Sequence, residues 1–204
     1  VGIIGRNGAG KSTLLNLAAG LIHPTEGTVL YRGEEVRGLN TDVGYVTQRD
    51  TLLPWRTVRS NVELGLELEG KTTESQRRAT STALLQLVGL SDVADLHPRQ
   101  LSGGMRMRVS IARALATQPK ILLMDEPCSA LDPIATAQIE ELIDELRQNY
   151  AVVIVTHSMH QAARISQKTA FFHMGTLVEF GDTKTVFTNP RDPQTESYIT
   201  GRIG

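Results

Sequence analysis

The segment GRNGAGKS, residues 5–12, is the most informative part of the sequence for its fold and its chemistry. A glycine, four residues and then Gly-Lys-Ser form the pattern of a phosphate-binding loop. The segment follows the apolar stretch VGIIG, which predicts a short buried strand, and precedes LLNLAAGL, whose apolar residues recur at helical spacing. Strand, glycine loop and helix in this order are the setting in which such a loop works.

Each residue type in this pattern has a chemical use. Glycines let backbone N–H groups wrap around a phosphate, and the N-terminus of the following helix adds favourable polarity. Lys11 can reach the β and γ phosphates of a nucleotide, and the Ser12 hydroxyl can ligate Mg²⁺. The alternative is a purely structural glycine turn, but the flanking strand and helix favour the phosphate site.

A second candidate element is ILLMDEP, residues 121–127, an apolar strand that ends in two carboxylates. Asp125 is placed to hold Mg²⁺ directly or through water, and Glu126 could polarise an attacking water. An acidic pair at a strand end is often no more than a solvated terminus. Its position after a core strand, in a chain that also has a phosphate loop, favours the metal interpretation.

Two further apolar strands have polar ends, with Gln48 at the end of VGYVTQ and His157 at the end of AVVIVTH. In a parallel sheet the carboxyl ends of the strands meet at one edge, where ligands bind. Gly5, Gln48, the Asp125–Glu126 pair and His157 are therefore predicted to converge on one nucleotide site.

Strands and helices alternate in two parts of the chain, and the part between them is mostly helical. Apolar strands without in-out alternation, separated by helices, predict an α/β fold with a mostly parallel sheet. Within a single domain, 1–204, we predict an α/β core of residues 1–56 and 119–204 and a helical subdomain of residues 57–118. The segments TAFFHM and GTLVEF predict a final hairpin, and RG at 32–33 predicts a turn between two short strands.

Local signals also mark the ends of two helices in the helical subdomain. Thr73 and Gln76 fit a capping box, and Gly89 should end the same helix. Its apolar stripe is predicted to comprise Ala79, Ala83, Leu84, Leu87 and Val88. The segment LSGGM, residues 101–105, should begin the next helix with Ser102 as its N-cap.

Composition limits the classes of function. The net charge of −1 gives no global reason to expect binding to nucleic acid or to an anionic membrane surface. No apolar run reaches the roughly 20 residues of a membrane span, so any work at a membrane needs a partner. Cys128 is the only cysteine, which favours a reducing compartment. Because the chain opens inside an apolar run, we expect its small N-terminal β region to be truncated.

Taken together, GRNGAGKST, Gln48, LSGGM, ILLMDEP, SALD at 129–132 and His157 occur in the order found in ATP-binding cassette (ABC) ATPases, which the chain resembles over essentially its whole length. In that family the signature LSGGQ contacts the ATP bound to the opposite protomer. The resemblance implies that Ser102 and the backbone of Gly103 and Gly104 face a γ phosphate across a dimer interface. Met105 stands where the family has glutamine, which affects only a side-chain contact.

The resemblance also implies roles for the other candidates, with ATP and Mg²⁺ as cofactors. Glu126 would be the general base, His157 would orient the γ phosphate, and Gln48 would sense Mg²⁺ and the attacking water. Asp132 would lie in the loop that couples the two sites. The phosphates and Mg²⁺ would be bound by Gly5, Asn7, Gly8, Gly10, Lys11, Ser12 and Thr13, and the metal set would be Ser12, Gln48 and Asp125. An adenine-stacking aromatic is not assigned.

Two subfamilies are represented. Residues 122–204 are very similar to phosphate-import ATPases, and residues 48–119 resemble the ATPases of nitrate, sulfonate and taurine importers. The resemblance implies the ATPase of an oxyanion importer, phosphate favoured, with nitrate, sulfonate or taurine as the alternative. A second copy would complete the ATP sites, and a permease, fed by a binding protein, would hold the dimer at the cytoplasmic face of the inner membrane. No nucleic acid partner is expected.

Two other classes of ATP-binding protein fit the sequence less well. Soluble ABC ATPases that act on DNA or ribosomes tend to carry coiled coils, zinc insertions or a second cassette, which this sequence does not contain. A P-loop kinase has no use for LSGG or SALD. Two features stay open at this level: Trp55 is either a permease contact or part of a small core under a loop, and Arg106, Arg108 and Arg113 predict a mixed solvated and intersubunit face.

Overall fold

The computed structural model describes residues 1–202. The chain forms two compact units. The first unit comprises residues 1–41, 123–126 and the chain from residue 152 onward, and the second comprises residues 42–122 and 127–151. The division into a core of residues 1–56 and 119–204 and a helical subdomain of residues 57–118 stays a prediction.

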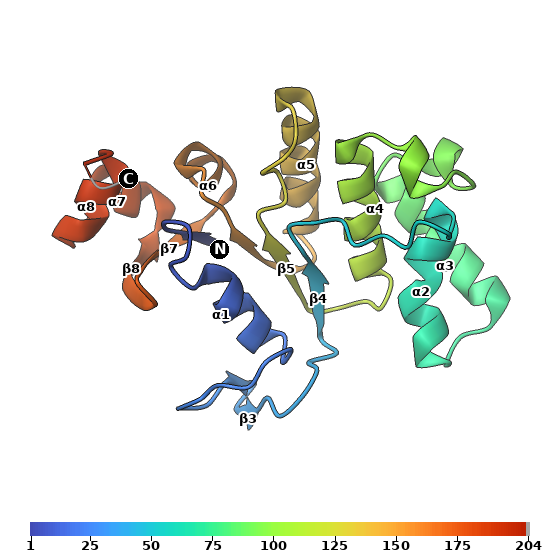
Figure 1. The fold of residues 1–204 in the computed structure, drawn as a ribbon, viewed down its shortest axis with the longest axis horizontal. Helices are drawn as coiled ribbons and strands as arrows, with labels where there is room; N and C mark the ends of the chain where they lie inside the picture. Colours follow the sequence, from blue (N-terminus) through green and yellow to red (C-terminus); the bar gives the residue numbers. More distant parts are fainter. Residues whose placement is uncertain (203–204) are drawn as a thin grey trace. The chain divides into compact units, whose positions relative to one another are not determined.

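The larger sheet is mostly parallel, as predicted, and has six strands in the order β4-β5-β6-β1-β7-β8. Of these strands, β4, β5, β7 and β8 are labelled in Figure 1. β1 pairs in parallel with both β6 and β7, and β7 pairs antiparallel with β8, which confirms the predicted final hairpin. The strand bounds are β1 Gly2–Ile4, β4 Val43–Val46, β5 Ile121–Asp125, β6 Ala151–Val155, β7 Lys168–His173 and β8 Thr176–Asp182.

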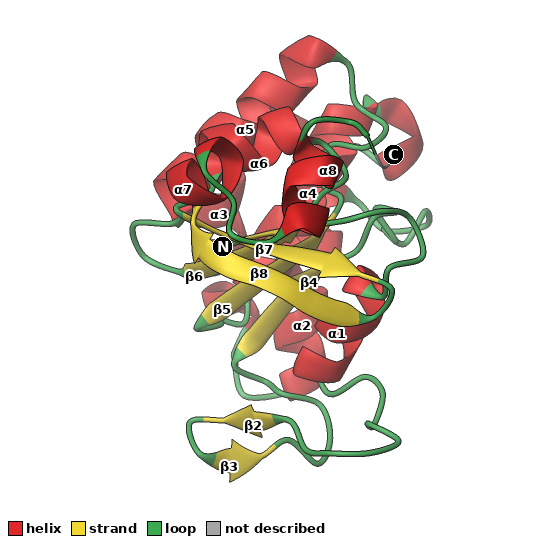
Figure 2. Ribbon diagram, turned by 90° about the vertical axis from the view of Figure 1, so that its left-hand side faces the viewer, coloured by secondary structure: helices red, strands yellow, loops and turns green. Residues whose placement is uncertain are grey.

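The first unit adds four helices and a small hairpin among the described residues. The helices are α1 Lys11–Ala18, α6 Met159–Ile165, α7 Thr183–Thr188 and α8 Pro193–Ile199, and the hairpin is β2 Leu30–Tyr31 with β3 Glu34–Glu35. The hairpin forms a separate two-stranded sheet (Figure 2). Arg32 and Gly33 join its strands with φ angles of 52° and 85°, the left-handed geometry that two-residue hairpin turns require.

The second unit is largely helical. Its α-helices are α2 Val58–Glu69, α3 Glu74–Leu87, α4 Gly103–Leu115 and α5 Pro133–Leu146, with short 3₁₀ turns at Ser91–Val93 and Pro98–Gln100. Helix α2 packs against α3 and α4, and Val58, Val62, Val109 and Ile111 are fully buried. Within the described residues, no helix is long and apolar enough to cross a membrane.

The predicted apolar stripe of α3 is wrong at its two alanines, while Val88 is buried and Leu84 and Leu87 are half-buried. Both ends of the helix are as predicted, with the capping box of Thr73 and Gln76 at its start. However, Ala79 and Ala83 are exposed, and the fully buried positions include Ser81 and Leu85. An alanine side chain buries little apolar area, whereas Leu85 gains more from burial, and Ser81 is satisfied by donating to the Glu63 carboxylate at 2.6 Å.

Candidate nucleotide-binding site

The glycine loop of the first unit is a compact turn that leads directly into α1. Gly8 and Gly10 have φ angles of 78° and 91°, and the Ala9 N–H donates to the Arg6 carbonyl at 3.1 Å. A side chain at Gly8 would meet nothing within 4 Å, so this glycine is required by backbone conformation rather than by space. The exposed loop residues Arg6, Asn7 and Gly8 precede the helix, and Ser12 and Thr13 are exposed in its first turn.

Lys11 is folded back onto this loop. Its Nζ donates to the Gly5 carbonyl at 2.8 Å and to the Arg6 carbonyl at 2.9 Å, and the residue is only 5% exposed. Burial lowers the pKa of Lys11, while the nearby carboxylates of Glu126 and Asp125 oppose that shift. Two backbone carbonyls therefore hold the Lys11 ammonium at the loop by hydrogen bonds, and two carboxylates stabilise its positive charge. Phosphate oxygens could take the place of these carbonyl oxygens.

Asp125, at the end of β5, is hydrogen-bonded by the Ser12 side chain. Burial raises the pKa of Asp125, the Ser12 hydrogen bond lowers it, and the adjacent Glu126 raises it further. The Oδ1 atom is buried without a hydrogen-bond partner in the described part of the chain. Because an unpaired buried carboxylate oxygen is costly, this atom fits a site for a cation, and Mg²⁺ prefers oxygen ligands of this kind.

Glu126 and His157 form a pair at the ends of β5 and β6. The Nδ1 atom of His157 lies 3.0 Å from Glu126 Oε2, and the Glu126 N–H donates to the Val155 carbonyl at 2.9 Å. When the carboxylate is ionised it accepts, so Nδ1 carries the proton. Glu126 has a φ angle of 48°, a conformation that costs a residue with a side chain about 1–3 kcal/mol and is found mostly at functional sites.

The remaining candidates lie in the second unit. Ser102 is the N-cap of α4, as predicted, and its Oγ accepts the Met105 N–H at 3.3 Å. Asp132 is the N-cap of α5, and its carboxylate accepts the N–H groups of Ile134 and Ala135 at 3.0 and 2.9 Å. Gln48 follows β4. The first unit thus brings Gly5, Lys11, Asp125, Glu126 and His157 together, whereas convergence with Gln48 stays a prediction.

Gly104 has a packing role in addition to its predicted role at a phosphate. A Cβ built on Gly104 would lie 2.7 Å from the Cβ of Ala135 on α5, whereas one on Gly103 would meet the ends of two side chains, Leu131 at 3.3 Å and Arg106 at 4.0 Å. We expect Gly104→Ala to destabilise the fold by about 1–3 kcal/mol, because Ala135 cannot rotate away. The matched variant Gly103→Ala should be neutral or stabilising by up to about 1 kcal/mol. Urea unfolding of both variants checks the difference, and equal stabilities would contradict it.

Arginines of α4 make specific contacts within the protomer, while the predicted intersubunit contact of this face stays a prediction. Arg106 Nε donates to Asp50 Oδ2 at 2.8 Å, and Arg113 donates to the Thr51 carbonyl at 2.9 Å. Ser110, between them, donates to the Asp50 carbonyl at 2.9 Å. The segment just after Gln48 is therefore tied to the helix that Ser102 begins.

Residues 1–129 match the ABC transporter family model, so the chain belongs to the ABC transporter family. The chain is similar to the phosphate import ATP-binding protein PstB of Bacteroides fragilis, with 46% identity over 220 residues, covering 100% of this chain and 87% of that protein.

Its fold is that of an ABC ATPase. It is similar to the ATP-binding cassette MJ0796 in a dimeric post-hydrolysis state bound to ADP and Pi, with a TM-score of 0.78 and 34% identity over 89% of this chain and 84% of that one. The family and fold inferred from the motifs are confirmed.

Proposed function

We propose that this chain is the ATP-hydrolysing subunit of an ABC importer for phosphate. The observation that carries the catalytic part is the first unit's arrangement of Lys11 on the glycine loop, the Ser12–Asp125 pair and the Glu126–His157 pair at 3.0 Å. The full-length similarity to a phosphate import ATP-binding protein supports phosphate over the nitrate, sulfonate and taurine alternative, which rests on the middle of the chain alone.

Each group has a task in hydrolysis. The loop N–H groups and Lys11 bind the β and γ phosphates, replacing the carbonyls that now hold the ammonium. Ser12 and Asp125, together with Gln48, would hold Mg²⁺, which neutralises charge on the β and γ phosphates when bound. Glu126 accepts a proton from water as its oxygen attacks the γ phosphorus and the bond to the β phosphate oxygen breaks. His157 orients Glu126 and the γ phosphate.

A second copy of the chain completes the proposed site. Ser102 is exposed and caps an α-helix, so its hydroxyl and the first backbone N–H groups of α4 can meet a phosphate that approaches from outside the protomer. The similar cassette MJ0796 is described as dimeric with ADP and Pi. We therefore assign Ser102, Gly103, Gly104 and Asp132 to the interface of an ATP-bound dimer.

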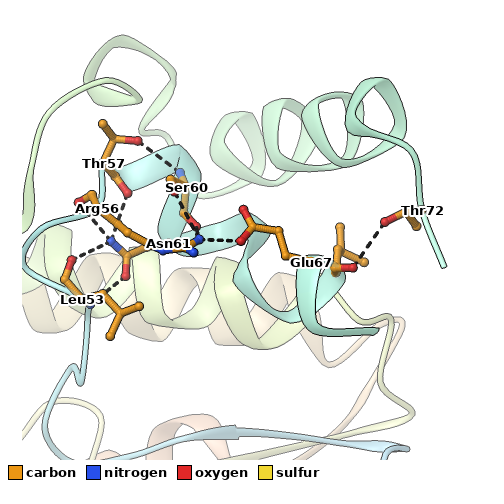
Figure 3. A network of polar contacts seen from close by, with 8 residues as sticks. Leu53, Arg56, Thr57, Ser60, Asn61, Glu67 and Thr72 are labelled. Carbon is orange, nitrogen blue, oxygen red and sulfur yellow. Dashed lines mark hydrogen bonds and ion pairs between the residues drawn. The ribbon is translucent and has the colours of Figure 1, made fainter. Parts of the chain in front are cut away.

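The loop of residues 53–57 is the proposed contact with the permease. Asn61 is fully buried and holds this loop: its Oδ1 accepts the Leu53 N–H at 2.8 Å, and its Nδ2 donates to the carbonyls of Leu53, Arg56 and Thr57 (Figure 3). Trp55, in the middle of the loop, is 72% exposed, so it is not part of a core under the loop. A rigid loop that displays a tryptophan suits an interface anchor, because little conformational entropy is lost on docking.

Trp55→Ala tests this contact. We expect unchanged ATP turnover by the free chain but at least a 30-fold weaker interaction with the permease, since a buried interface tryptophan is worth 2 kcal/mol or more. Leu68→Ala is the matched control, because Leu68 is 80% exposed elsewhere in the second unit. Co-purification and permease-stimulated turnover measure the effect. Equal stimulation of both variants would place the permease contact elsewhere.

The transported anion is tested by reconstituting the subunit with its permease and binding protein in vesicles. Phosphate should stimulate ATP turnover and enter the vesicles, while nitrate, sulfonates and taurine should not. Stimulation by one of the other anions would assign the chain to that group of importers. Turnover that rises with DNA or ribosomes, and not with the permease, would overturn the importer assignment and favour the soluble class.

A further inference from the structure

Tyr198, on the last described helix α8, packs in one buried cluster with Ile4 of β1, the strand that leads into the glycine loop. Tyr198 is 7% exposed, and its ring stacks on Phe171 with centroids 4.8 Å apart and an angle of 24°. Phe171 pairs in register with Ile4, and Ile4, Ala162, Phe171 and Tyr198 form one buried cluster. The tyrosine ring therefore packs in the same cluster as Ile4, the last residue of β1 and the residue before Gly5.

The hydroxyl of Tyr198 extends from this cluster to the loop itself. It is hydrogen-bonded to the backbone of Gly5, the first residue of the loop. The carbonyl of the same Gly5 accepts the Lys11 ammonium at 2.8 Å. Tyr198 also lines, with residues 5–9 of the loop, His157 and His173, a cavity of about 740 Å³ in the first unit. One tyrosine thus reaches the residue whose carbonyl sets the resting position of Lys11.

Gly5 is confined on its other side as well. A Cβ built on Gly5 would lie 2.2 Å from the carbonyl oxygen of Phe172, and Gly5 has a φ angle of 154°. Farther along the loop, the Gly175 N–H donates to the Ala9 carbonyl at 3.0 Å. The backbone of Gly5 is therefore held between β7 and the Tyr198 hydroxyl, while the β7–β8 turn holds the middle of the loop.

Helix α8 is itself fixed, which a positioning role requires. The Glu179 carboxylate of β8 accepts the N–H groups of Arg191 and Asp192 at 3.0 and 3.2 Å. Asp192 in turn caps α8 by accepting the Gln194 N–H at 2.7 Å. Seven residues are too few for a helix that is stable alone, so α8 depends on these anchors and on Tyr198. Helix α8 also packs against α7, beside which it is drawn in Figure 1.

The ring and the hydroxyl of Tyr198 have different roles. A phenylalanine would stack on Phe171 equally well, so packing alone does not require the hydroxyl. A buried hydroxyl needs a partner, and here the partner is a backbone group of the phosphate loop rather than a neighbouring core residue. Loss of the hydroxyl should therefore change the order of the phosphate loop, whereas loss of the ring should lower the stability of the fold.

We propose that Tyr198 is a positioning residue of the nucleotide site: its hydroxyl fixes Gly5, and through Gly5 the resting place of Lys11, so that the loop is preformed for the β and γ phosphates. This inference rests on the proposed function, since the benefit of a preformed loop is tighter ATP binding. Preorganisation of this kind raises affinity by lowering the cost of ordering the loop on binding.

The test compares Tyr198→Phe, which keeps the ring, with the parent. We expect the Kd and KM for ATP to rise about three- to tenfold, the range that one hydrogen bond gives, with kcat within about twofold. Backbone amides of residues 5–11 should exchange with solvent faster by a similar factor, while those of α8 and β7 stay protected. Tyr198→Ala should also lower the melting temperature, because the stack on Phe171 is lost.

Tyr150→Phe is the matched control, since it removes a tyrosine hydroxyl in the second unit and should change neither readout. The proposal is overturned if Tyr198→Phe binds ATP like the parent, or if exchange rises equally in α8 and β7, which would indicate a purely structural role. Failure of the proposed function looks different: the parent itself would not bind ATP, and the exchange of residues 5–11 in the nucleotide-free protein would still decide whether the hydroxyl orders the loop.

Discussion

Replacing Glu126 by glutamine should lower ATP turnover by a factor of about 10² to 10⁴, the usual contribution of a general base, while ATP binding is retained. Glutamine has the shape of glutamate and an oxygen that can still accept from the His157 Nδ1, which now lies 3.0 Å from the carboxylate. It cannot take a proton from water. Lys11 and the loop are unchanged, so the nucleotide still binds.

The same variant should accumulate an ATP-bound dimer, because closure around two nucleotides is no longer followed by hydrolysis. Steady-state phosphate release, nucleotide titration and size-exclusion chromatography with ATP measure the three effects. Glu141→Gln is the control, since Glu141 is an exposed carboxylate on α5 in the second unit, whereas Glu126 lies in the first. Hydrolysis by the Glu126 variant at the parental rate would show that another group accepts the proton.

The parts of the site that sequence predicts well are those whose chemistry is local. The loop pattern fixes both the glycine conformations and the position of Lys11, and a polar residue after an apolar strand predicts where Glu126 and His157 lie. The N-cap at Ser102 is equally local, because a serine before two glycines and an amphipathic run begins a helix. For these elements a few neighbouring residues determine the outcome.

The parts that sequence did not predict depend on contacts between distant residues. The ties from Arg106 and Arg113 to residues 50 and 51 span more than 50 positions, and an arginine on a helix carries no sign of which acceptor it will meet. Tyr198 lies on a short helix with no pattern that points to the loop. In α3 the apolar pattern does not show which residues are buried, because alanine gains little buried area and the exposed Ala79 and Ala83 yield to Leu85.

Replacing Ser102 by arginine is expected to lower turnover at least a hundredfold, the loss that removal of preorganised donors at a transition state produces. Ser102 is exposed, so the protomer can accommodate the larger side chain, and the change lies in the second unit while Lys11 lies in the first. ATP should therefore still bind to each protomer. The long side chain fills the space that a phosphate of the other copy needs, so a dimer that carries the arginine at both of its sites does not close, whereas a dimer with one parental Ser102 keeps one site open.

Loss of the N-cap alone must be separated from this steric effect. Ser102→Ala removes the Oγ that accepts the Met105 N–H, at a cost of about 1 kcal/mol in stability, but leaves the approach open. We expect this variant to lose clearly less turnover than Ser102→Arg, because it removes one hydroxyl but leaves the backbone N–H groups at the start of α4 open to the phosphate. If Ser102→Ala lost activity as fully as Ser102→Arg, the cap rather than the interface would explain the result.

Mixing the two inactive variants gives the sharpest test of a site shared between copies. In a dimer of one Ser102→Arg copy and one Glu126→Gln copy, one site combines an intact Glu126 with an intact Ser102 from the partner, and the other site carries both defects. With random pairing, about half of the dimers are mixed, and one of the two sites in each mixed dimer is intact. About a quarter of all sites are then intact, so turnover should return to about a quarter of the parental value. If each copy hydrolysed ATP with its own Ser102 and Glu126, every site in the mixture would carry one defect and no activity would return.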